Sequence, residues 1–169
     1  MTLAALLCSA VMGLSIPNAE YACRYMNTLV EEAQAKDLDP EIIIALIHEE
    51  SRWKAMAESR SGACGLMQVL PKYTRPHVSC KNLKKPKISL REGTKALSYW
   101  VYEYAGGNYE KGLCGYNGGY KCGKRSKQYA RRVMRLAKKL NEQVGRRRAY
   151  QDTIKELNLQ MNVIPPETK

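Results

Sequence analysis

Two adjacent carboxylates, Glu49 and Glu50, close the apolar run "EIIIALIHEE" that spans residues 41–50. Successive residues of a helix lie about 100° apart, so the two side chains cannot both face the same cleft. A glutamate that ends a buried helix at the mouth of a cleft would be partly desolvated. It would then have the raised pKa that a general acid needs near neutral pH. The residue pattern does not choose between the two, and it also allows a frayed helix end with both carboxylates in water.

Three short motifs combine with this acidic pair. In chain order they are Glu50-Ser51 with Ser59, Gly62 and "GLMQ" at residues 65–68, then "GYNGG" at residues 115–119, then "YARRV" from Tyr129. In kind and order they resemble the motifs of the soluble lytic transglycosylase family, and they cover roughly residues 38–140. The first motif is highly specific, whereas the other two would be weak without it. The resemblance implies a lysozyme-like fold that cleaves the glycan strand of peptidoglycan.

The resemblance also implies a role for individual residues. Glu50 corresponds to the general acid, which later acts as the base. The other residues that it implies at the substrate are Ser59 near the acetamido group of the reacting sugar, Met67 and Gln68 along the cleft, Tyr116 near Glu50, Asn117 beside it in the second motif, and Tyr129 on the opposite wall.

Each of these residues also has a purely structural interpretation. Met67 is a common core residue, Ser59 and Asn117 are common in turns, and Tyr129 is the first apolar position of its helix. The chain also departs from the family pattern, with Ala55 where proline is frequent and Gly118 where alanine is usual. These departures affect loop rigidity more than chemistry.

The shortage of other carboxylates bears on the mechanism. Most glycosidases use two carboxylates that flank the scissile bond, and between Ser51 and Tyr116 only Glu58 lies close to Glu50 in sequence. The resemblance implies a mechanism with a single acid, without metal or cofactor. In that mechanism Glu50 protonates the oxygen after N-acetylmuramic acid (MurNAc), whose own acetamido group stabilises the positive centre. Ionised Glu50 then deprotonates the C6 hydroxyl, which closes a 1,6-anhydro ring.

The elements that must position these residues are helices. Apolar spacing predicts a helix over residues 20–36, and Asp39-Pro40 is an N-cap followed by proline, which starts a buried helix. Ser89 and Glu92 predict a capping box at the start of another helix. The remaining expectations are an irregular loop at residues 55–65, a short helix between residues 106 and 119, and a helix from Ser126.

No run of residues is typical of a strand, so we expect a mainly α protein. With the resemblance, this becomes a lysozyme-like single domain of packed helices with a substrate cleft. The expected division is an apolar segment at residues 1–18, the catalytic domain at 19–140, and a basic then polar extension at 141–169 that frays in "NVIPPETK".

The net charge of +12 predicts an acidic partner: nucleic acid, a membrane surface or an anionic wall polymer. Residues 121–139 carry nine Lys or Arg and no acid, yet apolar residues recur within them at helical spacing from Tyr129. This pattern predicts an amphipathic helix with a basic outer face, whose Lys124, Arg125 and Arg132 we expect to attract anionic walls. No motif for nucleic acid is present, so we do not expect nucleic acid to be the main partner.

Six cysteines suit an oxidising compartment. No CxxC pair occurs, and only two histidines, His48 and His77, could add ligands, so a zinc site is not expected. Cys114 and Cys122 bracket the loop "GYNGGYK", and we predict that a disulfide closes it. Free buried thiols are the alternative.

The first sixteen residues carry no charged side chain, like the apolar region of a signal peptide, although no Lys or Arg precedes them. Cleavage near Gly13-Leu14-Ser15 would remove Cys8 and leave an odd number of cysteines. Export to the periplasm or cell wall is expected, with a phage virion as the alternative location, and membrane association through residues 1–16 stays open.

Two other functions remain open at this point. A hydrolytic lysozyme of the goose type resembles this family in fold and in its glutamate. A structural component of a secretion channel or phage particle could keep the same fold as a module that anchors it to the wall.

Overall fold

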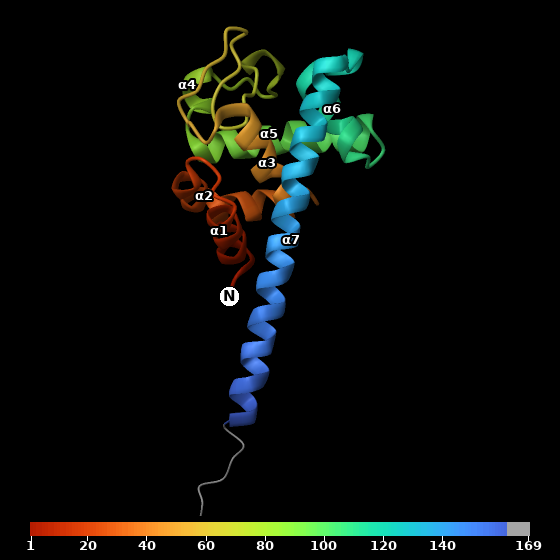
Figure 1. The fold of residues 1–169 in the computed structure, drawn as a ribbon. Helices are drawn as coiled ribbons and strands as arrows, with labels where there is room; N and C mark the ends of the chain where they lie inside the picture. Colours follow the sequence, from red (N-terminus) through yellow and green to blue (C-terminus); the bar gives the residue numbers. More distant parts are fainter. Residues whose placement is uncertain (162–169) are drawn as a thin grey trace, which may run out of the picture.

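The computed structural model describes residues 1–161 and consists almost entirely of helices (Figure 1). Within these residues there is no β-strand, and two isolated bridges join Cys64 to Glu58 and to Val69. The prediction of a mainly α fold is confirmed. The helices are α1 (Leu3–Gly13), α2 (Ala19–Gln34), α3 (Pro40–Ser51), α4 (Cys80–Leu83), α5 (Pro86–Ser98), α6 (Tyr109–Gly118) and α7 (Lys124–Met161), with short 3-10 turns η1 (Pro71–Tyr73) and η3 (Gly119–Lys121) and a π-helical segment η2 (Tyr99–Tyr104).

Helix α3 packs against α2 and α7 and carries the acidic pair at its C-terminal end. It begins at Pro40 as predicted, because the fixed φ of proline suits the first position of a helix. Asp39 takes the N-cap position without a capping bond from its side chain, and its backbone N–H donates to the Tyr109 hydroxyl at 2.8 Å. All side chains from residue 42 to residue 48 are buried, as the apolar pattern predicts.

The predicted capping box at Ser89 and Glu92 is wrong. Helix α5 begins three residues earlier, at Pro86, which supplies the stronger start signal at its first position. Ser89 is buried inside the helix, and its hydroxyl accepts a hydrogen bond from the backbone N–H of Met67 at 3.2 Å. Its role is therefore to hold the loop that follows α3 against α5.

Helix α1 packs against α2 and α7, and its apolar side chains are part of the core. A disulfide between Cys8 and Cys23 joins it to α2. None of the described helices combines the length and the apolar character that crossing a membrane requires. The buried residues of α1 are Ala4, Leu6, Leu7, Ala10 and Val11.

We expect Leu7→Ala to lower the free energy of unfolding by about 2–5 kcal/mol, because it removes a fully buried side chain and leaves a cavity. Chemical denaturation followed by circular dichroism measures the change. Met12→Ala is the control on the same helix, since Met12 is 55% exposed and its truncation should change little. Equal, small effects at both positions would show that α1 does not pack as described.

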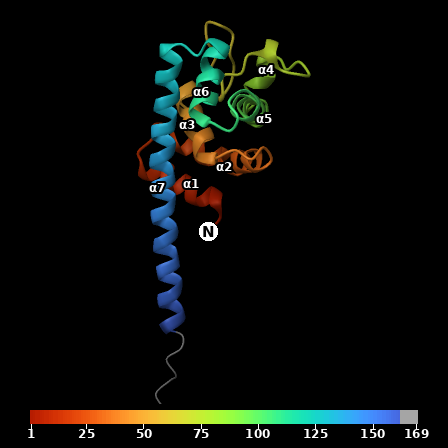
Figure 2. The ribbon, with the colours of Figure 1, turned by 90° about the vertical axis from the view of Figure 1, so that its right-hand side faces the viewer.

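Helix α7 is 38 residues long and crosses the whole body (Figure 2). Its buried face includes Tyr129, Val133, Leu140 and Val144, and it packs against α3, α6 and α1. It starts at Lys124, two residues before the predicted Ser126, which is the usual uncertainty of a helix boundary.

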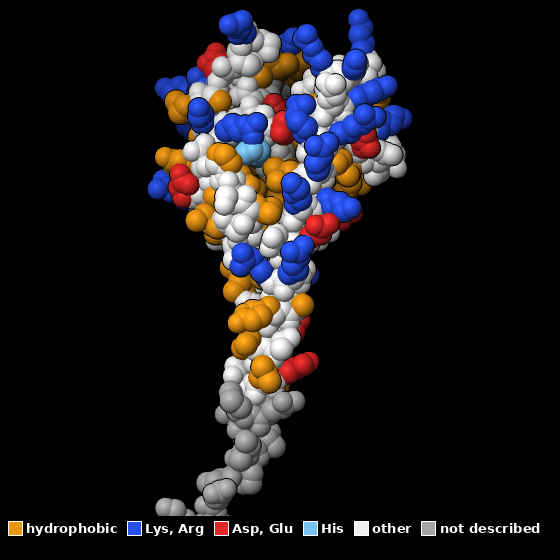
Figure 3. Space-filling view, in the orientation of Figure 1, with side chains coloured by type: hydrophobic (Ala, Val, Ile, Leu, Met, Phe, Trp, Pro, Cys, Tyr) orange, Lys and Arg blue, Asp and Glu red, His pale blue; other side chains and the backbone are white. Residues whose placement is uncertain are grey.

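The C-terminal part of α7 projects beyond the body as a stem (Figure 1). The helix continues without a break through residue 141, so the expected boundary between domain and extension lies inside one helix. Lys and Arg cover the upper part of this face of the molecule, whereas apolar and acidic side chains follow the stem (Figure 3). The expected fraying of "NVIPPETK" falls on residues 162–169, which lie outside the described residues.

Candidate active site

Glu50 lies at the C-terminal end of α3, where the first turns of α7 pass over it. One of its carboxylate oxygens accepts a hydrogen bond from the Tyr129 hydroxyl at 2.7 Å. Burial raises the pKa of Glu50 to about 7, the Tyr129 hydrogen bond lowers that pKa, and the charge of Glu49 raises it. A carboxyl with this pKa is protonated in part of the molecules at neutral pH, so it can both give and take a proton.

Glu49 has a different environment although it is the next residue. Its carboxylate pairs with the Arg132 guanidinium of α7 at 2.9 Å, and its side chain is only 13% exposed. Both glutamates therefore have protein partners, so the structure does not show a frayed helix end with both carboxylates in water. Among the described residues, no ion pair involves Glu50. The two carboxylates therefore differ, because Glu49 has a cationic partner and Glu50 has none.

Ser51 fixes the loop that follows α3. Its hydroxyl donates to the backbone carbonyl of Leu66 at 2.8 Å, which holds the "GLMQ" segment against the end of the helix. Arg52 and Trp53 both have positive φ, 52° and 64°, so the chain reverses immediately after α3. Trp53 is buried in the core, which anchors this reversal. The serine of the Glu-Ser pair thus has a positioning role.

Gly65 is required by close packing as well as by its backbone angle. Its φ is +79°, and a Cβ atom there would lie 2.0 Å from the carbonyl oxygen of Leu83. Gln68 follows with a φ of 50°, and its side-chain amide donates to the carbonyls of Gly65 at 3.0 Å and Ala57 at 3.2 Å. The loop is therefore held in one shape, and Gln68 lies on the wall of the adjoining cleft.

Met67 occupies the core and not the cleft surface on which the resemblance places it. Its side chain is 0% exposed, and a Cβ atom at Gly93 would lie 2.4 Å from its sulfur. The backbone of Met67 contributes instead, because its carbonyl accepts a hydrogen bond from the Tyr116 hydroxyl at 2.7 Å. Burial, and then the nearby charge of Glu50, raise the pKa of Tyr116 well above its usual value. Tyr116 therefore lies near Glu50 in this structure.

Ser59 and Asn117 are more peripheral. The Ser59 hydroxyl accepts from the Ala63 backbone N–H at 3.0 Å and lies 2.9 Å from the Ser61 hydroxyl, so it stabilises a turn in the loop. Asn117 is exposed in the last turn of α6 and lies on the cleft wall. The structure thus gives Ser59 a turn role, and a contact with the acetamido group of a sugar stays a prediction.

A cleft of about 800 Å³ has Tyr116 on its wall. Glu50 itself does not line the cleft, so the two meet through Tyr116. The lining residues are Gln68, Val69, Leu70, Tyr73, Arg75, Glu92, Lys95, Ala96, Tyr99, Trp100, Gly115, Tyr116, Asn117, Gly118, Gly119 and Tyr120.

An aromatic wall forms part of this cleft. The Tyr99 and Tyr120 hydroxyls lie 2.6 Å apart, and the rings of Trp100 and Tyr120 have centroids 5.1 Å apart. Gly115 allows this packing, because a Cβ atom there would lie 2.4 Å from the Trp100 ring. Sequence reasoning missed this wall and the cations beside it. One available signal was composition: the chain has 11 Tyr and no Phe, a preference for rings with a polar tip that suits a partly wet surface.

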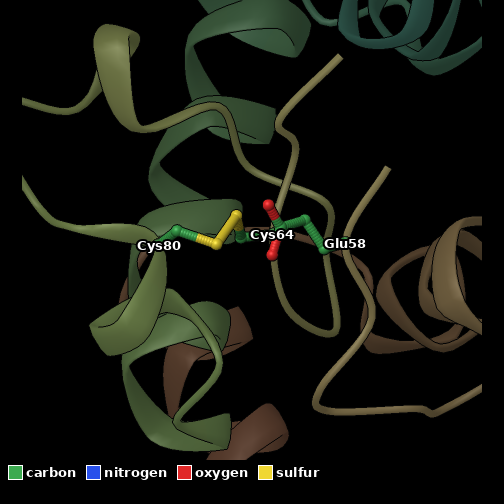
Figure 4. Close-up of side chains that lie close together, drawn as sticks. All are labelled: Glu58, Cys64 and Cys80. Carbon is green, nitrogen blue, oxygen red and sulfur yellow. A yellow bond between two sulfur atoms is a disulfide. The ribbon is translucent and has the colours of Figure 1, made fainter. Parts of the chain in front are cut away.

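Three disulfides hold the segments around the site. The predicted Cys114–Cys122 bond is confirmed, and Cys8–Cys23 and Cys64–Cys80 are the others. Figure 4 shows the Glu58 carboxylate beside the Cys64–Cys80 bond. Because these sulfur atoms are bonded to each other, neither is a thiolate that could bind a metal, and Glu58 pairs with Lys84 at 2.6 Å.

Comparison with known proteins agrees with this geometry. The family model described as "Transglycosylase SLT domain" matches residues 18–139, which include Glu50, Tyr116 and Tyr129. The chain belongs to this family. The matched range begins shortly before α2 and ends within α7, so the stem lies outside it.

Individual members of the transglycosylase SLT domain family are more distant. The soluble lytic murein transglycosylase of Salmonella typhimurium is 28% identical over 104 residues, 56% of this chain but only 16% of the relative. Among solved structures, an inactive glutamate-to-glutamine mutant of lytic transglycosylase Slt from Pseudomonas aeruginosa aligns with a TM-score of 0.65 at 24% identity, over 70% of this chain and 24% of that one. A complex of the 70-kDa soluble lytic transglycosylase with bulgecin A aligns with a TM-score of 0.66 at 20% identity, over 73% of this chain and 25% of that one. These alignments show a shared helical fold, as the lysozyme-like prediction requires.

Proposed function

We propose that this protein is a peptidoglycan lytic transglycosylase that cleaves the bond between MurNAc and N-acetylglucosamine (GlcNAc) with Glu50 as its single catalytic carboxyl. The observation that carries the proposal is the position of Glu50: a carboxyl with a pKa of about 7, held by Tyr129, beside a cleft with aromatic walls. A long sugar chain fits such a cleft, because aromatic rings and amide groups bind the apolar faces and hydroxyls of sugars.

The proposed reaction needs one proton carrier. Glu50 donates its proton to the glycosidic oxygen while the bond from C1 of MurNAc to that oxygen breaks, and the acetamido oxygen of the same sugar bonds to C1. Ionised Glu50 then takes the proton of the C6 hydroxyl as O6 attacks C1 and displaces the acetamido oxygen. The product has a 1,6-anhydro ring, and Glu50 is protonated again for the next cycle. Tyr129 positions the carboxyl through both steps.

The other nearby carboxylates support a single-acid mechanism. Glu49 is paired with Arg132, and Glu58 is paired with Lys84 and is 52% exposed. Within residues 1–161, Glu92 is the only carboxylate that lines the cleft, and it is buried and paired with Arg91 at 3.0 Å. Because Glu92 lines the cleft, it is the residue that a two-carboxylate mechanism would have to use.

Known relatives support the proposal through their printed descriptions. One relative is a murein transglycosylase, one was solved as an inactive glutamate-to-glutamine mutant, and one was solved with bulgecin A. This chain spans only 16% of the curated relative, so activity and substrate are carried over as part of the proposal. Three disulfides suit an oxidising location such as the periplasm or the wall.

The pH dependence of cleavage gives a test in which two variants should shift the pH profile in opposite directions. In the native protein kcat/KM should fall above about pH 7, where Glu50 loses the proton that it must donate. Tyr129→Phe removes a hydrogen bond that lowers the pKa of Glu50, so the fall should move to higher pH. Glu49→Gln removes a charge that raises this pKa, so the fall should move to lower pH.

Rates of muropeptide release between pH 5 and 9 measure both shifts. Glu31→Gln, at an exposed position of α2, is the control and should leave the pH profile unchanged. Movement of both profiles in the same direction, or of neither, would contradict the assignment of Glu50 as the titrating acid.

A further inference from the structure

Two cations lie on the wall of the cleft without an acidic partner. Arg75 and Lys95 both line it, and no ion pair within 4.0 Å involves either of them among the described residues. Glu92, the one carboxylate that the described part of the chain places on this cleft, is paired with Arg91. The cleft therefore has a positive region whose charge the protein does not neutralise.

Backbone carbonyls hold both cations in place. The Lys95 ammonium donates to the carbonyl of Arg75 at 2.6 Å, so the two residues are adjacent. One nitrogen of the Arg75 guanidinium donates to the carbonyls of Lys72 at 2.9 Å and Thr74 at 2.8 Å. Among the described residues, no hydrogen bond involves the other guanidinium nitrogens, and the Lys95 ammonium has no second partner. These charged donors can therefore bind a carboxylate.

The positive region is continuous with the aromatic wall. Glu92, Lys95, Ala96 and Tyr99 all lie on the cleft, and their spacing places them on one face of α5 continuing into η2. A ligand in the cleft would meet aromatic rings toward Tyr99 and positive charge toward Lys95. This arrangement suits a molecule with an apolar ring system and an anionic branch.

A glycan of GlcNAc and MurNAc with amide-linked peptides carries no charge on its sugars, because the lactyl carboxyl is consumed in the amide. Its negative charges are the carboxylates of the peptide stems. We propose that Arg75 and Lys95 bind a carboxylate of the peptide stem and so make the enzyme selective for strands whose stems are charged. This inference rests on the proposed function.

The test compares one substrate in two forms, a peptide-bearing glycan strand with free stem carboxylates and the same strand with those carboxylates amidated. Native protein should cleave the charged form with a kcat/KM roughly tenfold higher or more, mainly through KM, as expected for a charge-assisted contact. The double variant Arg75→Gln, Lys95→Gln should lose this preference, because its kcat/KM on the charged form falls to about the value that it has on the amidated form.

Two further variants separate charge from structure. Lys87→Gln removes one positive charge, as Arg75→Gln alone does, from an exposed position of α5 outside the cleft lining, and it should keep the preference. Arg75→Lys restores a positive charge and should recover part of the preference that Arg75→Gln loses.

The outcomes distinguish this inference from the function beneath it. Equal cleavage of both forms by native protein, or equal losses on both forms in the double variant, would overturn the inference while the transglycosylase proposal stands. If native protein cleaves neither form and also does not cleave a peptide-free strand, both the inference and the transglycosylase proposal are overturned. If Lys87→Gln also loses the preference for the charged form, the preference comes from the overall charge of the protein, and the role of Arg75 and Lys95 is rejected.

Discussion

Glu50→Gln is expected to lower the rate of wall cleavage by roughly 10²–10⁴-fold, the usual contribution of a general acid. Glutamine keeps the volume of glutamate and can still accept the Tyr129 hydrogen bond, but it has no proton to donate to the glycosidic oxygen. Release of soluble muropeptides from purified sacculi measures the loss.

The same variant should be more stable than the native protein at alkaline pH. The pKa of Glu50 is raised from its usual value to about 7 by burial, so its stabilising protonated form is fully present at low pH and is lost as pH rises through 7. Above that pH, the cost of the buried charge is about 3 kcal/mol by linkage. Denaturation at pH 9 should therefore show a gain for Glu50→Gln that disappears near pH 4.

Glu49→Gln is the matched control for both measurements. It should retain most of the activity, and it should lose stability, because it leaves Arg132 without its partner. Comparable loss of activity at both positions, with circular dichroism unchanged, would contradict the assignment of Glu50. An active Glu50→Gln protein would contradict the assignment of Glu50 directly.

The second large effect concerns the product. If Glu50 works without a second carboxylate, every new end should be 1,6-anhydroMurNAc, which is lighter by one water than the reducing end that a lysozyme produces. Mass spectrometry of the released muropeptides separates these products completely. The expected outcome is a fragment set without new reducing ends.

The control for this experiment is a hydrolytic lysozyme on the same sacculi. Exclusively reducing ends from this protein would reject the transglycosylase reaction and favour the goose-type alternative. In that case Glu92 is the carboxylate to replace first, because it lines the cleft, whereas Glu58 is exposed and paired with Lys84.

The helices that carry the site were largely predictable from local signals. Pro40 and the apolar run after it are sufficient for α3, and the apolar spacing from Tyr129 is sufficient for the first half of α7. The start of α5 was missed because Ser89 and Glu92 fit a capping box, although Pro86, three residues before Ser89, is the stronger start signal. Local patterns compete, and the packing of Ser89 against Met67 decides this one.

The chemistry of the site was less accessible from the residues. Nothing near Glu49 and Glu50 in sequence distinguishes them, because the distinction comes from Tyr129 and Arg132, about 80 positions later. Met67 was placed by resemblance on the cleft, and in the structure only its backbone takes part. The cations Arg75 and Lys95 belong to no motif, and their shared position depends on how α5 packs beside the loop before it.

The hydrogen bonds of the site have a consequence for folding. Tyr129 to Glu50 spans 79 positions of the chain, and Tyr116 to Met67 spans 49, whereas each disulfide spans 16 positions or fewer. Short loops close at lower entropic cost than long ones, so the cysteine pairs can meet in a chain that is still largely unfolded. The acid and its tyrosine meet only when α3 and α7 have docked. A partly folded chain with every disulfide in place therefore still lacks the contact between Glu50 and Tyr129.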